Sequence, residues 1–141
     1  MRYGELINLL IVDLQGLLRS HVRIKDATFQ QVIAISIIPD TGIEMTSLSR
    51  KLGIDNSTAT RLVDGLGKKH WIEKTLYSDD KRVVIVLLTR KGVMIQKKIE
   101  SQFDKIGEKV ESLFTATDSI NILEGMRSLH WKLARMLLNK K

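Results

Sequence analysis

One interruption in an otherwise helical hydrophobic pattern constrains this chain more than any other feature. Two runs rich in strand-forming residues, WIEKTLY at 71–77 and RVVIVLLT at 82–89, flank the four polar residues SDDK. Two such runs joined by a short polar turn predict a β-hairpin. Elsewhere, apolar residues recur at intervals of three and four, which is typical of amphipathic helices. The sequence therefore predicts a mainly α protein with a small β-hairpin, an α+β fold.

Long helices are predicted at both ends of the chain, over roughly 4–21, 90–114 and 118–138. The last would be capped by Thr117 or Asp118. The first helix either is well buried in its own subunit or packs also on a second one. Because the apolar stripes of these helices offer more surface than a small middle part can cover, we expect long N- and C-terminal dimerisation helices and a homodimer.

The segment 45–69 predicts a short helix, a tight turn and a longer helix. Thr46 can cap the first helix, and Gly53 supplies the left-handed residue that ends it. Asp55 or Asn56 can cap the second helix. This arrangement is typical of a helix–turn–helix, whose second helix reaches base edges in the major groove.

Small polar residues and one arginine occupy the outward positions at the start of the second helix: Ser57, Thr58, Thr60 and Arg61. Ser and Thr are also good capping residues, so Ser57 alone has an equally good structural explanation. Arg61 favours the DNA reading, because arginine is the best side-chain partner of guanine in the major groove.

A hairpin directly after a helix–turn–helix is a wing, and its charged tip can contact DNA. Lys81 or Arg82 would supply positive charge to the phosphate backbone or the minor groove. Asp79 and Asp80 favour the turn, and one of them can hold Arg82 by a salt bridge. The competing interpretation is that turns are usually polar whatever their function.

Charge and composition favour an anionic partner and give no support to an enzyme. The chain has 23 basic and 16 acidic residues, and residues 44–92 hold ten basic and six acidic ones. It has no cysteine, and its three histidines match no metal-ligand spacing, so we expect no metal and no cofactor. GLGKK at 65–69 lacks the spacing of a phosphate-binding loop, and no catalytic set is found.

The apolar run at 6–18 raises the question of a membrane segment. Asp13 and Gln15 interrupt it, so it falls short of the roughly 20 apolar residues that a span requires. A basic start followed by a small-residue cleavage site is not evident either. We therefore expect a soluble, cytoplasmic protein without membrane contact.

With these features in place, the chain resembles the MarR family of winged helix–turn–helix transcriptional regulators. SLSRKLGIDNSTATRLVDGL is similar to the family's Leu-x-x-x-Leu-Gly, capped turn and Ser-Thr-x-x-Arg-Leu-Val-Asp-x-Leu pattern. DKRVVIVLLTRKG is similar to its wing signature, Asp-x-Arg followed by Leu-Thr-x-x-Gly. The matching residues are Asp80, Arg82, Leu88, Thr89 and Gly92. The resemblance covers essentially the whole chain and is strongest over 28–92.

The resemblance implies a helical dimerisation region at 1–27 and 93–141 and a winged helix–turn–helix DNA-binding lobe at 28–92. It implies a dimeric, sequence-specific regulator, expected to be a repressor, that reads a pseudo-palindromic operator in double-stranded DNA. Its second motif helix would enter the major groove and its wing the minor groove. A small anionic or phenolic ligand bound between the dimer core and the lobe would release it.

Carried over by position, the resemblance places Ser57, Thr58, Thr60 and Arg61 on the DNA face, with Lys81 and Arg82 in the wing and Asp80 bracing the wing arginine. The alternative function is a winged-helix protein–protein interaction module without DNA contact. That alternative would predict loss of Arg61 or Arg82, and both are present.

Five positions depart from the family pattern. Asp55 with Asn56 replaces the usual Ser-Pro, and its anion should cost some affinity for DNA. Gly65 and Gly67 each cost about 1 kcal/mol relative to Ala in a helix, so the helix end is expected to fray or flex. His70 replaces a glycine and tolerates a positive φ better than a β-branched residue.

Ligand and sensor chemistry is less specified by the sequence. The absence of cysteine and of clustered histidines excludes the oxidant-sensing and zinc-sensing mechanisms of the family. Candidates to line a ligand pocket are Arg19, His21, Trp71, His130 and Trp131, with a core position as the expected alternative for the aromatic ones.

Overall fold

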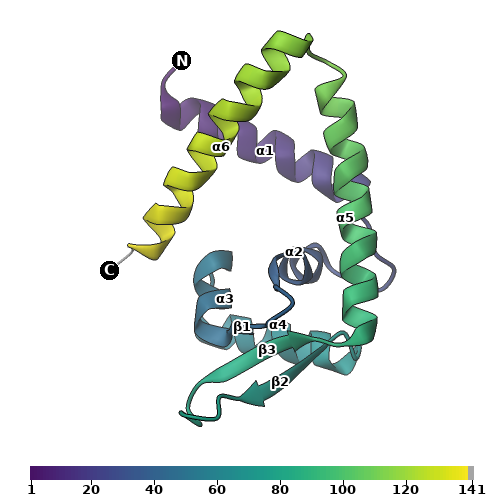
Figure 1. Cartoon of the computed structure of the whole chain (residues 1–141), viewed down its shortest axis with the longest axis vertical. Coiled ribbons are helices and arrows are strands. Elements are labelled where there is room, and N and C mark those ends of the chain that lie inside the picture. The colour runs from purple at the N-terminus through teal and green to yellow at the C-terminus, as the bar shows by residue number, and fades with distance from the viewer. Residues whose placement is uncertain (140–141) are drawn as a thin grey trace.

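The computed structural model describes residues 1–139 and arranges them as a lobe below and long helices above (Figure 1). In chain order the elements are α1 (Tyr3–His21), α2 (Phe29–Ile37), β1 (Ile43–Glu44), α3 (Met45–Leu52), α4 (Asn56–Lys68), β2 (Ile72–Leu76), β3 (Val84–Leu88), α5 (Arg90–Glu111) and α6 (Ala116–Leu138). The strands form one antiparallel sheet in the order β1-β3-β2. The predicted mainly α fold with a small β wing is confirmed.

The core of the lobe lies between α2, α3, α4, the sheet and the first half of α5. Completely buried side chains come from each of these parts: Ile35, Leu48, Leu66, Val86 and Ile99. The buried amide of Gln96 on α5 donates hydrogen bonds to the carbonyl oxygens of Ile35 and Ile38, at 2.9 and 2.8 Å. Because an unpaired buried carbonyl costs roughly 1–3 kcal/mol, these bonds fasten the end of α2 to α5.

The junction between the helix–turn–helix and the wing depends on backbone geometry. His70 adopts φ 61°, as anticipated for this position, and its carbonyl oxygen accepts a 2.6 Å hydrogen bond from the Thr89 hydroxyl. The same hydroxyl caps α5 by accepting the N–H of Gly92 at 3.0 Å. A Cβ atom on Gly92 would lie 1.9 Å from the carbonyl oxygen of Trp71, so only glycine fits at the end of the wing signature.

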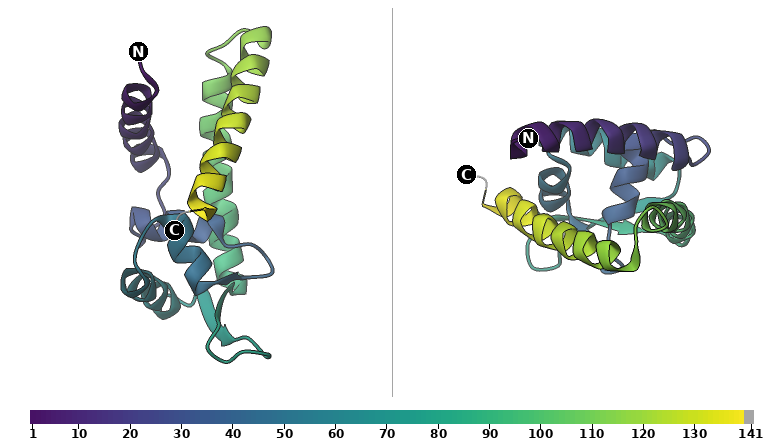
Figure 2. Two further views of the ribbon diagram at one scale, coloured as in Figure 1. Left: turned by 90° about the vertical axis from the view of Figure 1, so that its left-hand side faces the viewer. Right: turned by 90° about the horizontal axis from the view of Figure 1, so that it is seen from above.

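The helices α1 and α6 bury none of their side chains within the described chain. They overlap in the view of Figure 1, but Figure 2 shows that α1 runs apart from α5 and α6. The prediction that α1 is well buried in its own subunit is therefore wrong. Large exposed apolar side chains include Leu6, Leu9, Leu10 and Leu14 of α1 and Leu123, Met126, Leu129 and Leu133 of α6.

Two predicted caps are wrong. The helix α3 begins at Met45 after Glu44, so Thr46 lies inside it. The helix α6 begins at Ala116, about two residues earlier than expected, and its cap is Thr115, whose hydroxyl accepts the N–H of Asp118 at 3.2 Å. Both helices therefore begin before the residue that the sequence pattern predicted as the cap.

The wing is also longer at its tip than the sequence indicated. The strand β2 ends at Leu76 and β3 begins at Val84, so the tip spans 77–83 instead of four residues. The short strand β1, which pairs with β3 through Ile43 and Val86, was not predicted. The helix α4 is continuous through its two glycines to Lys68.

Candidate nucleic-acid interface

The start of α4 is fixed by Asp55. Its Oδ1 atom accepts hydrogen bonds from the backbone N–H of Thr58 at 2.7 Å and from the hydroxyl of Ser57 at 2.8 Å. These bonds, the backbone one first, lower the pKa of Asp55 to about 2. Of the two predicted caps, Asp55 is confirmed, and it remains an anion at neutral pH.

The four sequence-predicted residues of α4 lie together on its first two turns. Ser57, Thr60 and Arg61 are exposed, and Thr58 is half-buried. The Thr60 hydroxyl donates to the carbonyl oxygen of Asn56 at 2.8 Å, and Nη2 of Arg61 donates to Oγ1 of Thr58 at 3.5 Å. The inward positions Ala59 and Val63 are completely buried, which orients this row of polar side chains outward.

Arg82 at the tip of the wing is held by Asp80. The backbone N–H of Arg82 donates to Oδ1 of Asp80 at 3.0 Å, its Nε to the same atom at 3.2 Å and its Nη2 to Oδ2 at 3.4 Å. The side-chain bond to Arg82 is the largest cause that lowers the pKa of Asp80. The guanidinium nevertheless stays exposed, so the carboxylate orients it without removing it from solvent.

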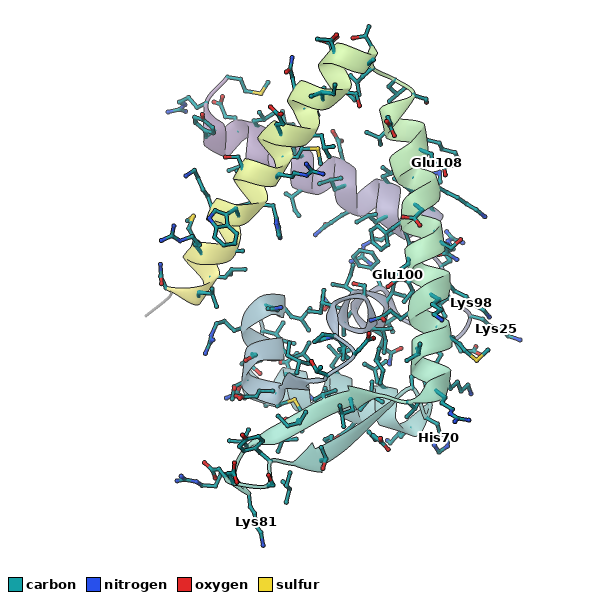
Figure 3. All side chains as sticks on the ribbon, viewed as in Figure 1. Lys25, His70, Lys81, Lys98, Glu100 and Glu108 are labelled. Carbon is teal, nitrogen blue, oxygen red and sulfur yellow. The ribbon has the colours of Figure 1, made fainter. Side chains whose placement is uncertain are left out.

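Lys81 lies beside Arg82 at the same tip. Its side chain is exposed and points away from the lobe (Figure 3). The wing therefore presents two adjacent positive side chains, one oriented and one free to move. An oriented guanidinium suits a narrow groove, whereas a mobile ammonium suits the phosphate backbone.

An ion pair that sequence reasoning missed connects the wing to α4. The Nζ of Lys74 on β2 lies 2.8 Å from Oδ1 of Asp64 on α4, and both side chains are about half exposed. Because the pair depends on how the sheet packs against the helix, no local sequence pattern identifies it. It joins the two elements that are proposed to contact DNA.

Further basic residues gather where the wing returns to α5. Arg90 and Lys91 are exposed in the first turn of α5, and His70 lies beside that turn (Figure 3). The N-terminus of a helix carries positive partial charge, so these cations are unfavourable there by a few tenths of a kcal/mol. An anionic partner at this end would offset that repulsion.

A cleft of about 320 Å³ lies between the end of α1 and α2. The guanidinium of Arg19 stacks over the ring of Phe29, 4.3 Å from its centroid. The residues that line the cleft are Arg19, Val22, Arg23, Ile24, Ala27, Phe29 and Val32. Of the predicted pocket residues only Arg19 lines it; Trp71 is buried in the core, and Trp131 is exposed.

Residues 1–139 contain neither a cluster of metal-binding side chains nor a membrane-spanning helix. No group of three or more His, Cys, Asp or Glu side chains in that range could hold a metal ion. No helix in that range is long and apolar enough to cross a membrane.

A helix–turn–helix followed by a two-stranded wing defines the chain as a winged helix–turn–helix protein. Comparison with solved structures agrees over nearly the whole chain. FabT of Streptococcus pneumoniae in complex with DNA matches with a TM-score of 0.77 at 22% identity, covering 96% of this chain and 99% of FabT. A cysteine-to-serine mutant of MarR from Escherichia coli with operator DNA matches with a TM-score of 0.71 at 27% identity, covering 89% and 90%.

Sequence comparison relates part of the chain to a known family. Residues 39–84 match the model of the MarR family. The transcriptional repressor MprA of Escherichia coli strain K12 is 33% identical over 69 residues, which are 49% of this chain and 39% of MprA. The chain thus spans less than half the length of this relative. These matches agree with the resemblance seen in the sequence: the part of the chain that is similar to the MarR family lies in the lobe that carries α4 and the wing.

Proposed function

We propose that this protein is a dimeric, sequence-specific DNA-binding transcriptional regulator that acts as a repressor, not an enzyme. The observation that carries the proposal is the pairing of two exposed arginines in one lobe. Arg61 lies on the outward face of α4, and Arg82 is oriented by a carboxylate at the wing tip. A regulator of this kind works where its operator lies, which we expect to be the cytoplasm.

In the proposed complex, α4 enters the major groove of each half-site. Ser57, Thr58 and Thr60 would contact phosphates and base edges, and Arg61 would pair with guanine. Arg82 would enter the minor groove while Lys81 contacts the adjacent backbone. The ion pair between Asp64 and Lys74 supports this arrangement, because it connects the wing to α4.

The exposed apolar faces of α1 and α6 support a homodimer. Leaving so many large apolar side chains in water is unfavourable, and a second copy of the chain would cover them. Two lobes related by a twofold axis would then read a pseudo-palindromic operator. We accordingly keep 1–27 and 93–141 as the proposed dimerisation region and 28–92 as the proposed DNA-binding lobe, with the first half of α5 also packing into the core of the lobe through Ile99.

The cleft beside α1 supports release by a small ligand. Arg19 and Arg23 offer positive charge there, and Phe29 offers an aromatic face. This chemistry suits a small anionic or phenolic molecule. The backbone N–H and carbonyl of Arg23 are both hydrogen-bonded to the Gln102 side chain on α5, at 2.8 and 2.9 Å. A ligand that moved Arg23 would therefore act on the helix that joins the lobe to the proposed dimer region.

The proposal is tested by fluorescence anisotropy on a labelled duplex from upstream of the protein's own coding sequence, with a scrambled duplex as control. We expect tight binding to the first that weakens steeply with salt, because phosphate contacts release counterions. Arg82→Ala should weaken it by about 1–3 kcal/mol.

Weak and equal binding to both duplexes, followed by failure to enrich any sequence from a random pool, would contradict the proposal. The protein–protein interaction module would then be the better account.

A further inference from the structure

The carboxylate at the start of α4 keeps spare acceptor capacity. The backbone N–H of Thr58 and the hydroxyl of Ser57 both donate to Oδ1 of Asp55, at 2.7 and 2.8 Å. The Thr58 hydroxyl also acts on this carboxylate and helps to lower its pKa. A carboxylate has about four lone-pair sites, so the exposed side chain is held by these contacts and can still accept from a partner at the end of α4 that is proposed to meet DNA.

An acceptor in this place discriminates among bases. The hydrogen bonds from Thr58 and Ser57 keep the pKa of Asp55 at about 2, so the group is ionised and accepts only. In the major groove, guanine and thymine present acceptor oxygens, which repel a carboxylate. Adenine presents an amino group beside the acceptor N7, whereas the amino group of cytosine has no acceptor beside it on its own edge. Cytosine therefore fits best.

The distance along α4 between Asp55 and Arg61 predicts the spacing of the bases that the two side chains would contact. Arg61 follows Asp55 by six positions, which places it about 120° around the helix axis with Thr58 between the two, and the charge of Arg61 contributes to the lowered pKa of Asp55. Six residues span roughly 9 Å of helix, and successive bases are about 3.4 Å apart. The acceptor and the donor are thus spaced to read bases roughly two to three base pairs apart.

We propose that Asp55 is a specificity-determining residue, whose carboxylate accepts a hydrogen bond from the amino group of one cytosine in each half-site. This inference rests on the proposed function. The same carboxylate repels phosphates and lowers affinity for any site that lacks the cytosine. The departure from the Ser-Pro pattern thereby selects an operator and does not merely weaken binding.

The test is selection of bound duplexes from a random pool by the full chain and by Asp55→Ser. Serine caps a helix about as well as aspartate but carries no charge, so α4 keeps its start. A second variant, Asp55→Asn, keeps the shape and prefers adenine, to which an amide donates and from which it accepts. As a control, circular dichroism would show whether both variants retain the wild-type helix content.

We expect the wild type to enrich one cytosine per half-site, roughly two to three base pairs from a guanine. Asp55→Ser should lose this cytosine but keep the guanine, and Asp55→Asn should shift the position towards adenine. Replacing the cytosine should cost the wild type about tenfold in affinity and the serine variant much less. Asp55→Ser should also bind scrambled DNA more tightly.

The same motif from wild type and Asp55→Ser would overturn this inference and leave the proposed function intact. Enrichment of no motif by the wild type would overturn both.

Discussion

The lobe of this chain buries its apolar side chains, whereas the helices α1 and α6 leave theirs exposed. In the lobe, side chains from α2, α3, α4, β3 and α5 are completely buried against one another. In α1 and α6, no side chain is buried, although leucine, isoleucine and methionine recur along both helices. The lobe can therefore be understood from one chain, whereas the helices are apolar enough to require a second surface. This difference separates the proposed DNA-binding lobe from the proposed dimerisation helices.

The largest effect should follow from a change inside the lobe. Gly92→Ala would place a methyl group 1.9 Å from the Trp71 carbonyl oxygen, so the junction of wing and α5 must shift. We expect a loss of about 4 kcal/mol or more in the free energy of unfolding, measured with urea.

Gly67→Ala in α4 is the matched control, since its nearest atom would be Cδ1 of Ile72 at 3.9 Å. It should be neutral or stabilising by up to about 1 kcal/mol. Equal effects from the two glycine variants would refute the packing described at the junction.

The next largest effect is expected from a substitution in the helix α6. Leu133→Asp in α6 would place an unpaired charge in the proposed dimer interface and weaken association by about 3 kcal/mol. Sedimentation velocity over a range of protein concentrations measures this shift from dimer to monomer. Ser128→Asp adds the same charge at a polar position of α6 and should leave association nearly unchanged. If both variants sediment like the wild type, α6 does not form the interface.

A smaller effect is expected from the brace of the wing arginine. Asp80→Ala removes the carboxylate that bonds Arg82 but also removes a negative charge near phosphate. We expect affinity for the selected duplex to fall by about two- to fivefold, less than for Arg82→Ala. In the background of Arg82→Ala the same change should have no unfavourable effect. An additive loss in anisotropy titrations would show that Asp80 acts independently of Arg82.

The smallest effect concerns pH. The pKa of Asp55 is lowered from 3.8 to about 2 in the folded chain. A lowered pKa contributes stability above the unfolded value that is lost as pH falls through the folded value. Urea unfolding of wild type and Asp55→Asn should therefore differ by a constant amount above about pH 5 and converge between pH 4 and pH 2. A difference that does not change with pH would show that the ionised carboxylate contributes nothing to the cap.

Local sequence signals predicted the elements that depend on local chemistry. Asp55 was identifiable as a cap because its side-chain oxygen acts on an N–H group three residues away. The strand β1 was missed because two residues carry no periodicity. Thr115 was missed because Thr117 and Asp118, two good capping residues, follow it directly.

The parts that sequence could not predict depend on packing between distant elements. Asp64 and Lys74 meet only because β2 lies against α4. Gln96 looks like a polar interruption of α5 until the end of α2 supplies its two carbonyl partners. The cleft at Arg19 likewise requires α1 and α2 to be placed first. The resemblance to the family anticipated the architecture, but these contacts are particular to the folded chain.

The most direct test of the division between lobe and helices is the stoichiometry on DNA. Sedimentation equilibrium of the protein with a duplex containing one selected operator would give the mass of the complex. We predict two chains per duplex, with no complex of one chain at intermediate ratios, because the helices join the two lobes before they bind. A complex of one chain per duplex, bound as tightly on a half-site as on the full operator, would contradict the account.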